Sequence, residues 1–207
     1  MNTIRLYRHA LSGHSHRAQL LLSLLGLNAE LVDVDLAAGE HKQSEFLARN
    51  RFGQVPVLED DDVVIADSNA ILVYLAKKYD TNKTWSPVEP VAAAEVQRFL
   101  SQAAGQVAYG PAAARLVNVF GAALDHQRAI AIAHNLLGIL ESYLEGREWL
   151  VGNNPTIADV ANYAYIAHAP EGDVSLQDYP NVRNWLGRIA ALPGFVPMQA
   201  TAVGLAA

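Results

Sequence analysis

The chain has 207 residues, of which 51% are hydrophobic and 17% are charged. That composition is too apolar for an intrinsically disordered protein, and the length suits one large domain or two small ones. Fifteen Lys and Arg residues against 21 Asp and Glu residues give a formal net charge of −6. Because no run rich in Lys or Arg occurs, we expect neither nucleic acid nor a membrane as a partner.

Two absences narrow the class of protein further. The chain contains no cysteine, which excludes disulfide bonds, thiolate metal sites and any mechanism that uses the protein's own thiol. Its apolar stretches, such as residues 20–25, are much shorter than the roughly 18–20 residues needed to cross a bilayer. The N-terminus shows no basic region followed by an apolar core, so we expect no secretory signal and a cytoplasmic location.

The first 80 residues alternate between strand-like and helix-like patterns. Residues 30–36 alternate apolar and polar side chains, as a half-exposed strand does. Residues 15–25 are rich in Leu and stop at Gly26, a typical residue after a helix. The predicted elements are a strand at 4–7, a helix at 15–25, a strand at 30–36, a short helix at 45–48, strands at 55–59 and 63–65, and a helix at 67–79. Their order, β-α-β-α-β-β-α, indicates a small α/β domain.

Beyond residue 80 the pattern becomes helical throughout. Residues 80–90 carry two prolines and no apolar period, which is typical of a linker. The helices predicted after it lie at 95–119, 124–144, 156–168 and 179–192. We therefore divide the chain into an α/β domain at 1–80, a linker at 81–91 and an all-helical domain at 92–207.

Several short motifs along the chain occur in a characteristic order. They are Leu6-Tyr7, Ser12-Gly13-His14-Ser15, Gly39-Glu40-His41-Lys42, the segment from Asn50 to Leu58, the segment from Ala66 to Leu75, and Val151-Gly152 with Thr156-Ile157-Ala158-Asp159. Together they resemble the glutathione S-transferase superfamily over nearly the whole chain. The resemblance implies a thioredoxin-like, glutathione-binding N-terminal domain, an α-helical C-terminal domain that forms the acceptor-substrate pocket, and a homodimer.

Ser12 and Ser15 are the candidates for activating the thiol of bound glutathione. A thiol is a weak nucleophile until it ionises, and a hydroxyl donor beside the start of a helix stabilises the thiolate. Either serine could instead simply cap the Leu-rich helix. The resemblance favours Ser12 as the thiolate donor and Ser15 as a cap or helper. Other classes of the superfamily use a tyrosine near the place of Tyr7, but an aromatic residue in a strand is more often part of the core.

Asp67 and Ser68 are predicted to receive the γ-glutamyl end of glutathione. This end carries a carboxylate and an ammonium on one carbon, and the N–H groups at a helix start, with the Ser68 hydroxyl, suit the carboxylate. Asp67, or an acid of a partner subunit, could take the ammonium. The same two residues also look like an ordinary helix cap. Both roles are compatible, because Asp67 can cap the helix while Ser68 binds the ligand.

Residues near Pro56 are predicted to hold the remainder of the peptide. Val55 could bind the backbone of the ligand by strand-type hydrogen bonds, with Pro56 marking the start of the strand. The resemblance implies a cis peptide bond at Pro56. His41 and Lys42, in the loop after the second strand, suit the glycyl carboxylate, although charged loop residues are often only solvated. The further candidates for glutathione binding are Gln54 and Arg17.

The acceptor substrate is expected in an apolar pocket between the two domains, where ligand sites often occur. The candidates for the wall of this pocket are Leu11, Tyr109, Arg115 and His168. Tyr109 could polarise the acceptor, but a buried aromatic residue on a helix is an equally good interpretation.

No metal site is expected, although four histidines lie in the first 41 residues at His9, His14, His16 and His41. His14 and His16 are two residues apart and do not share a helical face, and no acid or cysteine follows at ligand spacing. The acidic turn at 60–62 lacks the Gly and Glu of a calcium loop and indicates a solvated hairpin tip. Asp159, three residues after Thr156, is interpreted as a cap or a buried structural acid.

The predicted reaction is attack of the glutathione thiolate on a small hydrophobic electrophile, with glutathione peroxidase activity left open. The absence of cysteine removes the classes that form a mixed disulfide with glutathione, which leaves a bacterial-like transferase of the serine type. Arg51 stands where the family commonly has proline, so the loop before Val55 is expected to be less rigid. The alternative is a non-catalytic glutathione-binding regulatory or scaffold protein of the same fold, because folds outlast functions. The hydroxyl at Ser12 favours the enzyme.

Overall fold

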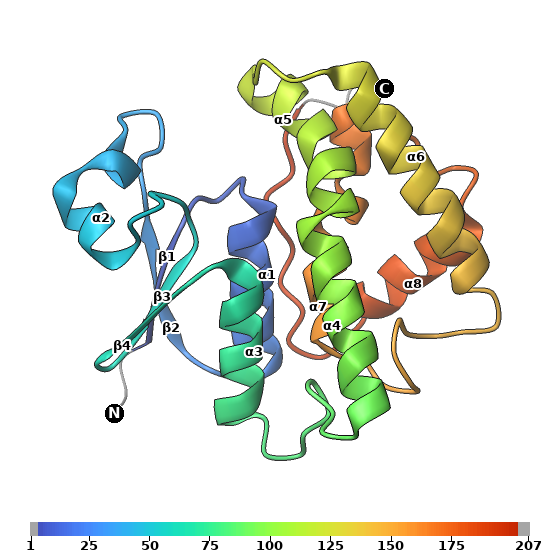
Figure 1. Cartoon of the computed structure of the whole chain (residues 1–207), viewed down its shortest axis with the longest axis horizontal. Helices are drawn as coiled ribbons and strands as arrows, with labels where there is room; N and C mark the ends of the chain where they lie inside the picture. The colour runs from blue at the N-terminus through green and yellow to red at the C-terminus, as the bar shows by residue number, and fades with distance from the viewer. Residues whose placement is uncertain (1–3, 203–207) are drawn as a thin grey trace.

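A four-stranded mixed sheet forms the centre of the N-terminal half (Figure 1). The structure, a computed structural model, describes residues 4–202. The strands are β1 (Ile4–Arg8), β2 (Ala29–Asp33), β3 (Val57–Asp60) and β4 (Val63–Ala66), in the spatial order β2-β1-β3-β4. β1 runs parallel to β2 and antiparallel to β3, and β3 and β4 form the predicted hairpin.

The two faces of this sheet are covered by different helices. The helices of this half are α1 (Gly13–Leu24), the 3₁₀ helix η1 (Glu40–Lys42), α2 (Ser44–Arg49) and α3 (Ser68–Tyr79). α1 and α3 lie side by side between the sheet and the helical half (Figure 1). Leu6 and Leu58 belong to the core cluster that these two helices share, whereas Val57 and Tyr7 pack with Phe46 of α2. Successive side chains of a strand point to opposite faces, and the predicted order β-α-β-α-β-β-α is confirmed.

In the described part of the chain beyond residue 80, helices joined by loops are the only regular secondary structure. They are α4 (Pro90–Ala104), the π helix η2 (Ala108–Ala112), α5 (Ala113–Phe120), α6 (His126–Tyr143), α7 (Ile157–Ala167), the 3₁₀ helix η3 (Ala169–Gly172) and α8 (Pro180–Ala190). α7 is the central helix, because every residue from Ile157 to Ile166 is buried and because it packs against both α1 and α4. Residues 203–207 of the predicted helical domain lie outside the described residues.

The single helix predicted at 95–119 is wrong, because the chain breaks it into α4, η2 and α5. α4 ends before Gly105, and η2 contains Pro111. Proline lacks the N–H that a regular helix needs and clashes with the preceding turn, so the chain widens into a π helix there. Gly110 lies against α6, where a Cβ atom would be 2.9 Å from the backbone nitrogen of Ala133. Periodicity alone does not register such a break.

Side-chain caps set two helix starts in this half. α4 begins at Pro90, inside the predicted linker, because the carboxylate of Glu89 caps it and proline suits the first turn. Thr156 and Asp159 form a capping box at the start of α7. Asp159 is buried and also accepts a 2.9 Å hydrogen bond from the indole of Trp185. Burial raises the pKa of Asp159 above its ordinary value, and the prediction of a buried structural acid is confirmed.

The hairpin turn at 60–62 departs from the prediction at one residue. Asp61 and Asp62 are exposed, as expected of a solvated tip, but Asp60 is fully buried. One of its carboxylate oxygens accepts hydrogen bonds from Lys78 at 2.7 Å and from the hydroxyls of Tyr74 and Tyr79. Burial opposes the charge, but these donors hold the pKa of Asp60 below its ordinary value. The acid ties the hairpin to the C-terminal end of α3.

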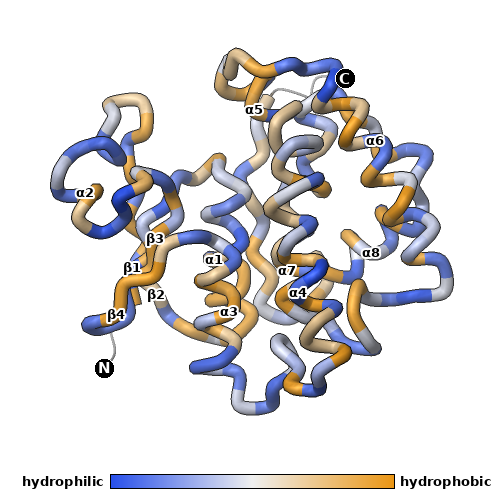
Figure 2. Tube along the Cα trace, viewed as in Figure 1, coloured by the Kyte–Doolittle hydropathy of each residue, from blue (hydrophilic) through white to orange (hydrophobic). Residues whose placement is uncertain are grey.

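One hydrophobic core joins the two halves. Its fully buried members include Leu6 in β1, Leu72 in α3, Leu136 in α6 and Trp185 in α8. Figure 2 shows hydrophobic residues concentrated along β3, β4 and α3. Within residues 4–202, no helix is both long and apolar enough to span a bilayer.

Candidate active site

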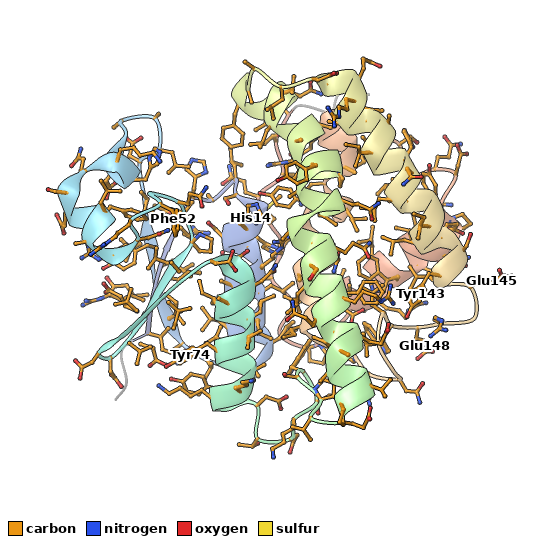
Figure 3. All side chains as sticks on the ribbon, viewed as in Figure 1. His14, Phe52, Tyr74, Tyr143, Glu145 and Glu148 are labelled. Carbon is orange, nitrogen blue, oxygen red and sulfur yellow. The ribbon has the colours of Figure 1, made fainter. Side chains whose placement is uncertain are left out.

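A cavity of about 650 Å³ lies where α1, the segment around η1, the loop before β3 and the start of α3 meet. Its lining is His14, Leu36, His41, Lys42, Asn50, Phe52, Gly53, Gln54, Val55, Pro56, Ala66, Asp67 and Ser68. His14 and Phe52 are labelled in Figure 3. The cavity therefore brings together seven residues predicted to bind glutathione, although they are spread over 28 positions of the chain, from residue 41 to residue 68. The predicted residues Ser12, Ser15 and Arg17 are not part of this lining.

The loop before β3 forms one side of the cavity. The Val55–Pro56 peptide bond is cis, as the family resemblance implies, and β3 begins one residue later. The side-chain amide of Asn50 donates a 2.8 Å hydrogen bond to the carbonyl of Gln54, and its oxygen accepts one from the N–H of Phe52. These two bonds hold the loop on both sides of Arg51. The side chain of Arg51 is exposed and, among the described residues, makes no hydrogen bond that supports the loop.

The glycyl end of the predicted ligand has a basic side chain in place. The ammonium of Lys42 donates hydrogen bonds to the carbonyls of Gly53 at 2.9 Å and Phe52 at 3.4 Å, which leaves its third donor hydrogen for an anion. Gly53 has φ of 58°, and a Cβ atom there would lie 2.7 Å from the carbonyl oxygen of His41. Glycine thus allows the loop to close against the segment that carries His41 and Lys42.

The other end of the cavity is the N-terminus of α3. Asp67 is its N-cap, because its Oδ1 accepts hydrogen bonds of 2.9 Å from the N–H groups of Asn69 and Ala70. Its φ is 76°, a left-handed value that is uncommon for an aspartate and that recurs at ligand sites. Ser68 follows as the first residue of the helix and lines the cavity. Asp67 therefore caps the helix, while Ser68 lines the cavity.

A fully buried arginine lies behind Ser68. One guanidinium nitrogen of Arg17 donates to Ser68 Oγ at 3.2 Å and to His14 Nδ1 at 3.0 Å, and the other reaches the carbonyl of Ala103 at 3.5 Å. No carboxylate pairs with Arg17 among residues 4–202. Burial lowers the pKa of Arg17 to about 10, so that the side chain stays charged at neutral pH. This cation makes the Ser68 end of the cavity suited to an anion.

Sequence reasoning missed His14 as a residue of this cavity. The sequence shows it within the Ser12-Gly13-His14-Ser15 motif and as one of four histidines without metal spacing, and neither pattern relates it to Arg17. The two residues are three apart on a helix and therefore neighbours on its surface. That spacing, together with the short distance along the chain to Ser12, is the signal that could have identified it.

The two serines predicted to activate the thiol lie at the start of α1. Ser12 is the N-cap, with its Oγ accepting a 3.2 Å hydrogen bond from the N–H of Ser15. It is half-buried, and its own O–H remains available to donate. Ser15 is only 1% exposed, and its Oγ accepts from the N–H of His9. Ser12 therefore has a hydroxyl hydrogen free beside the start of α1, whereas the Ser15 hydroxyl lies in the interior. Tyr7 donates to Glu59 and packs on Phe46, as a core residue does.

The four residues predicted for the acceptor pocket do not line one pocket. Arg115 is 1% exposed and forms an ion pair with Glu171, which also accepts from His168 at 2.8 Å. A second nitrogen of Arg115 donates to the carbonyl of Leu11 at 2.8 Å. Tyr109 is 69% exposed and lines a separate hollow beside α6. Arg115 and His168 are therefore members of a buried network, which fixes the loop just before Ser12.

Metal binding has no counterpart in the described residues. Among residues 4–202, no three His, Asp or Glu side chains gather in an arrangement that could hold a metal ion. His16 instead contacts the carbonyl of Val196 at 2.8 Å, and burial lowers its pKa to about 4.

Comparisons with known proteins agree with this geometry. The family described as "Glutathione S-transferase, N-terminal domain" matches residues 2–77, and "Glutathione S-transferase, C-terminal domain" matches residues 114–193. Glutathione S-transferase 3 of Zea mays is 33% identical over 94% of this chain and 92% of its own, and glutathione S-transferase 2 of Schizosaccharomyces pombe is 34% identical over 91% of each.

Solved structures agree as well. A glutathione S-transferase from Pseudomonas fluorescens Pf-5 superposes with a TM-score of 0.89 at 30% identity, over 95% of this chain and 99% of that one. A glutathione transferase homolog from Drosophila mojavensis with bound glutathione superposes with a TM-score of 0.84 at 28% identity, over 93% of this chain and 90% of that one. The predicted thioredoxin-like and helical domains are thereby confirmed. The chain belongs to the glutathione S-transferase superfamily, and the enzyme class predicted from its motifs, a glutathione transferase, is confirmed.

Proposed function

We propose that glutathione binds in the cavity between α1, the loop before β3 and α3, and that its thiolate is conjugated to a small hydrophobic electrophile. The observation that carries this proposal is the distribution of charge in the cavity. Glutathione has a carboxylate at each end, and the cavity has a cation near each end: Arg17 behind Ser68, and Lys42 beside Gly53. A zwitterionic peptide of three residues fits that arrangement.

The peptide lies extended in this proposal, with its γ-glutamyl carboxylate on Ser68 and on the N–H groups that begin α3. Its central residue pairs with the backbone of Val55, which lines the cavity just before β3 starts. Its glycyl carboxylate meets Lys42 and His41. Gln54 lines the same side and supplies further hydrogen-bonding groups.

The reactive step follows from the place of Ser12. Its hydroxyl donates to the sulfur while its oxygen accepts from the N–H of Ser15, and the positive end of α1 favours the thiolate over the thiol. The thiolate then forms a carbon–sulfur bond with the electrophile, and the displaced group leaves with the bonding electron pair. With an organic hydroperoxide as acceptor, the same sulfur would attack the terminal oxygen, the O–O bond would break and release the alcohol, and a second glutathione would reduce the resulting sulfenic acid to give the disulfide and water.

Ser12→Ala tests this role. We expect the glutathione dissociation constant to change by less than about three-fold, because Ser12 is not at either carboxylate end. Conjugation of a chlorinated nitrobenzene should fall about a hundred-fold, the usual effect of removing one donor to a developing anion. Thiolate absorbance and calorimetry are recorded on the same samples, with an organic hydroperoxide as a second acceptor.

Ser142→Ala is the matched control, because Ser142 is an exposed serine on α6 whose hydroxyl donates to the carbonyl of Gly138 in the same helix. It should leave binding and rate unchanged. Absence of glutathione binding in the wild type would overturn the proposed ligand, and binding without any thiolate signal would favour a non-catalytic binding protein. The proposal further includes a cytoplasmic homodimer, for which sedimentation gives the subunit number.

A further inference from the structure

His14 presents a polar group to the cavity that no interaction within the described residues uses. The residue begins the first turn of α1 and lines the cavity with Ser68. Its Nδ1 lies 3.0 Å from Arg17 and 3.4 Å from Ser68 Oγ. Its Nε2 has no hydrogen-bond partner among residues 4–202. One ring nitrogen is therefore engaged with protein, and the other is left for a ligand.

The partner on Nδ1 decides which nitrogen carries the hydrogen. A guanidinium has only donors, so Nδ1 must accept the bond from Arg17. The ring's hydrogen is then on Nε2. Burial, followed by the charge of Arg17, lowers the pKa of His14 to about 3, so the ring is neutral at physiological pH. The neutral ring in this tautomer offers a single N–H donor on Nε2.

The ring is also held in place from the helical half. The His14 and Tyr165 rings meet edge to face with centroids 5.0 Å apart, and the backbone N–H of His14 donates to the Tyr165 hydroxyl at 3.4 Å. The adjoining Gly13 lies so close to Tyr165 that a Cβ atom would stand 2.7 Å from its ring. A donor fixed by two neighbours loses little freedom when a ligand binds it.

We infer that the Nε2–H group of His14 donates a hydrogen bond to the γ-glutamyl part of bound glutathione, beside Ser68. The inference rests on the proposed function and adds a residue to it. The position of the ring decides which part of the ligand it meets, because His14 Nδ1 and Ser68 Oγ are 3.4 Å apart and both receive a hydrogen bond from one nitrogen of Arg17. Arg17 thus fixes the Ser68 hydroxyl and the His14 ring side by side at this end of the cavity.

His14→Leu tests the inference by calorimetry with three ligands. They are glutathione, S-methylglutathione and γ-glutamylcysteine, which share the γ-glutamyl group. We expect affinity for all three to fall by the same factor, about ten-fold, as for loss of one hydrogen bond to a charged group. Lys42→Ala, by contrast, should weaken glutathione and S-methylglutathione but leave γ-glutamylcysteine unchanged, because that ligand lacks the glycyl carboxylate.

Three results would overturn the inference. They are an unchanged affinity in His14→Leu, a loss that spares S-methylglutathione, which would place His14 at the thiolate, and a loss that spares γ-glutamylcysteine, which would place it at the glycyl end. Failure of the wild type to bind any of the three ligands would overturn the proposed function together with the inference. If the wild type binds normally and only His14→Leu loses binding, the result bears on the role of His14 and leaves the proposed function standing.

A second variant separates binding from folding. His14→Gln keeps an N–H donor at about the reach of Nε2, so we expect its affinity to lie within about three-fold of the wild type. His134→Leu is the matched control, since His134, on α6, bonds to the Tyr179 hydroxyl and lies outside the cavity lining. Thermal unfolding of each variant shows whether the fold is kept. An affinity for His14→Gln as low as that of His14→Leu would contradict the donor role.

Discussion

Arg17 and Arg115 are both 1% exposed, but they are balanced in different ways. Arg115 pairs with Glu171, which also takes a hydrogen bond from His168, so its charge is compensated inside the protein. Arg17 has only neutral hydrogen-bond partners, and among the described residues no carboxylate lies within ion-pair distance, although the more distant charge of Asp67 favours the guanidinium. A buried charge without a counterion is costly. A buried arginine that is paired with a carboxylate therefore indicates a structural role, whereas an unpaired one beside a cavity indicates an anionic ligand.

Breaking the paired site should have the largest effect on stability. In Glu171→Gln the charge of Arg115 loses its counterion, and we expect the free energy of unfolding to fall by about 3–5 kcal/mol, as is usual when one partner of a buried pair is removed. Urea denaturation measures the change. The double variant Arg115→Met with Glu171→Leu should recover much of the loss. A fall below about 1 kcal/mol in the single variant would contradict the buried ion pair.

Substitution of the unpaired Arg17 should change stability little and ligand affinity strongly. Arg17→Met removes a buried charge that has no counterion, so we expect the free energy of unfolding to change by less than about 1 kcal/mol. Glutathione affinity should fall by about thirty-fold, because the anionic end loses the nearby charge and the alignment of Ser68. Urea denaturation and calorimetry on one preparation give both values. A large loss of stability with unchanged affinity would make Arg17 a structural residue like Arg115.

The comparison also predicts a smaller effect, on the pH dependence of the free energy of unfolding. Burial opposes the charge of Glu171, but His168 and Arg115 hold its pKa below the ordinary value. The pair's contribution is therefore complete above the unfolded-state pKa, near 4.5, and disappears as pH falls through the lower folded-state pKa. The difference in unfolding free energy between the wild type and Glu171→Gln should be constant near neutrality and shrink below about pH 4.5. A difference that grew on acidification would contradict this assignment.

Most of the N-terminal half could be predicted because its pattern is local. The alternation of residues 30–36 and the turn at 60–62 mark β2 and the β3–β4 hairpin, and Asp67 before Ser68 marks the start of α3. The family motifs added the cis bond at Pro56. Each of these signals lies within a few neighbouring residues, where sequence patterns are informative.

The features that could not be predicted depend on contacts between distant parts of the chain. Asp60 is buried because Lys78 and two tyrosines of α3 reach it, 14–19 residues away. Arg115 was predicted to line a pocket, but its ion pair with Glu171, 56 residues later, makes it a structural residue. The role of His14 depends on Ser68, 54 residues away, and on Tyr165 in the other half. No periodic pattern carries that information.

A crystal structure of the wild-type protein with S-methylglutathione tests the central claim most directly. We predict one ligand in each chain's cavity, with its γ-glutamyl carboxylate within hydrogen-bond distance of Ser68 Oγ and His14 Nε2. The backbone of its central residue should pair with Val55, and its glycyl carboxylate should lie beside Lys42. A ligand bound in the reverse direction, or outside this cavity, would contradict the account.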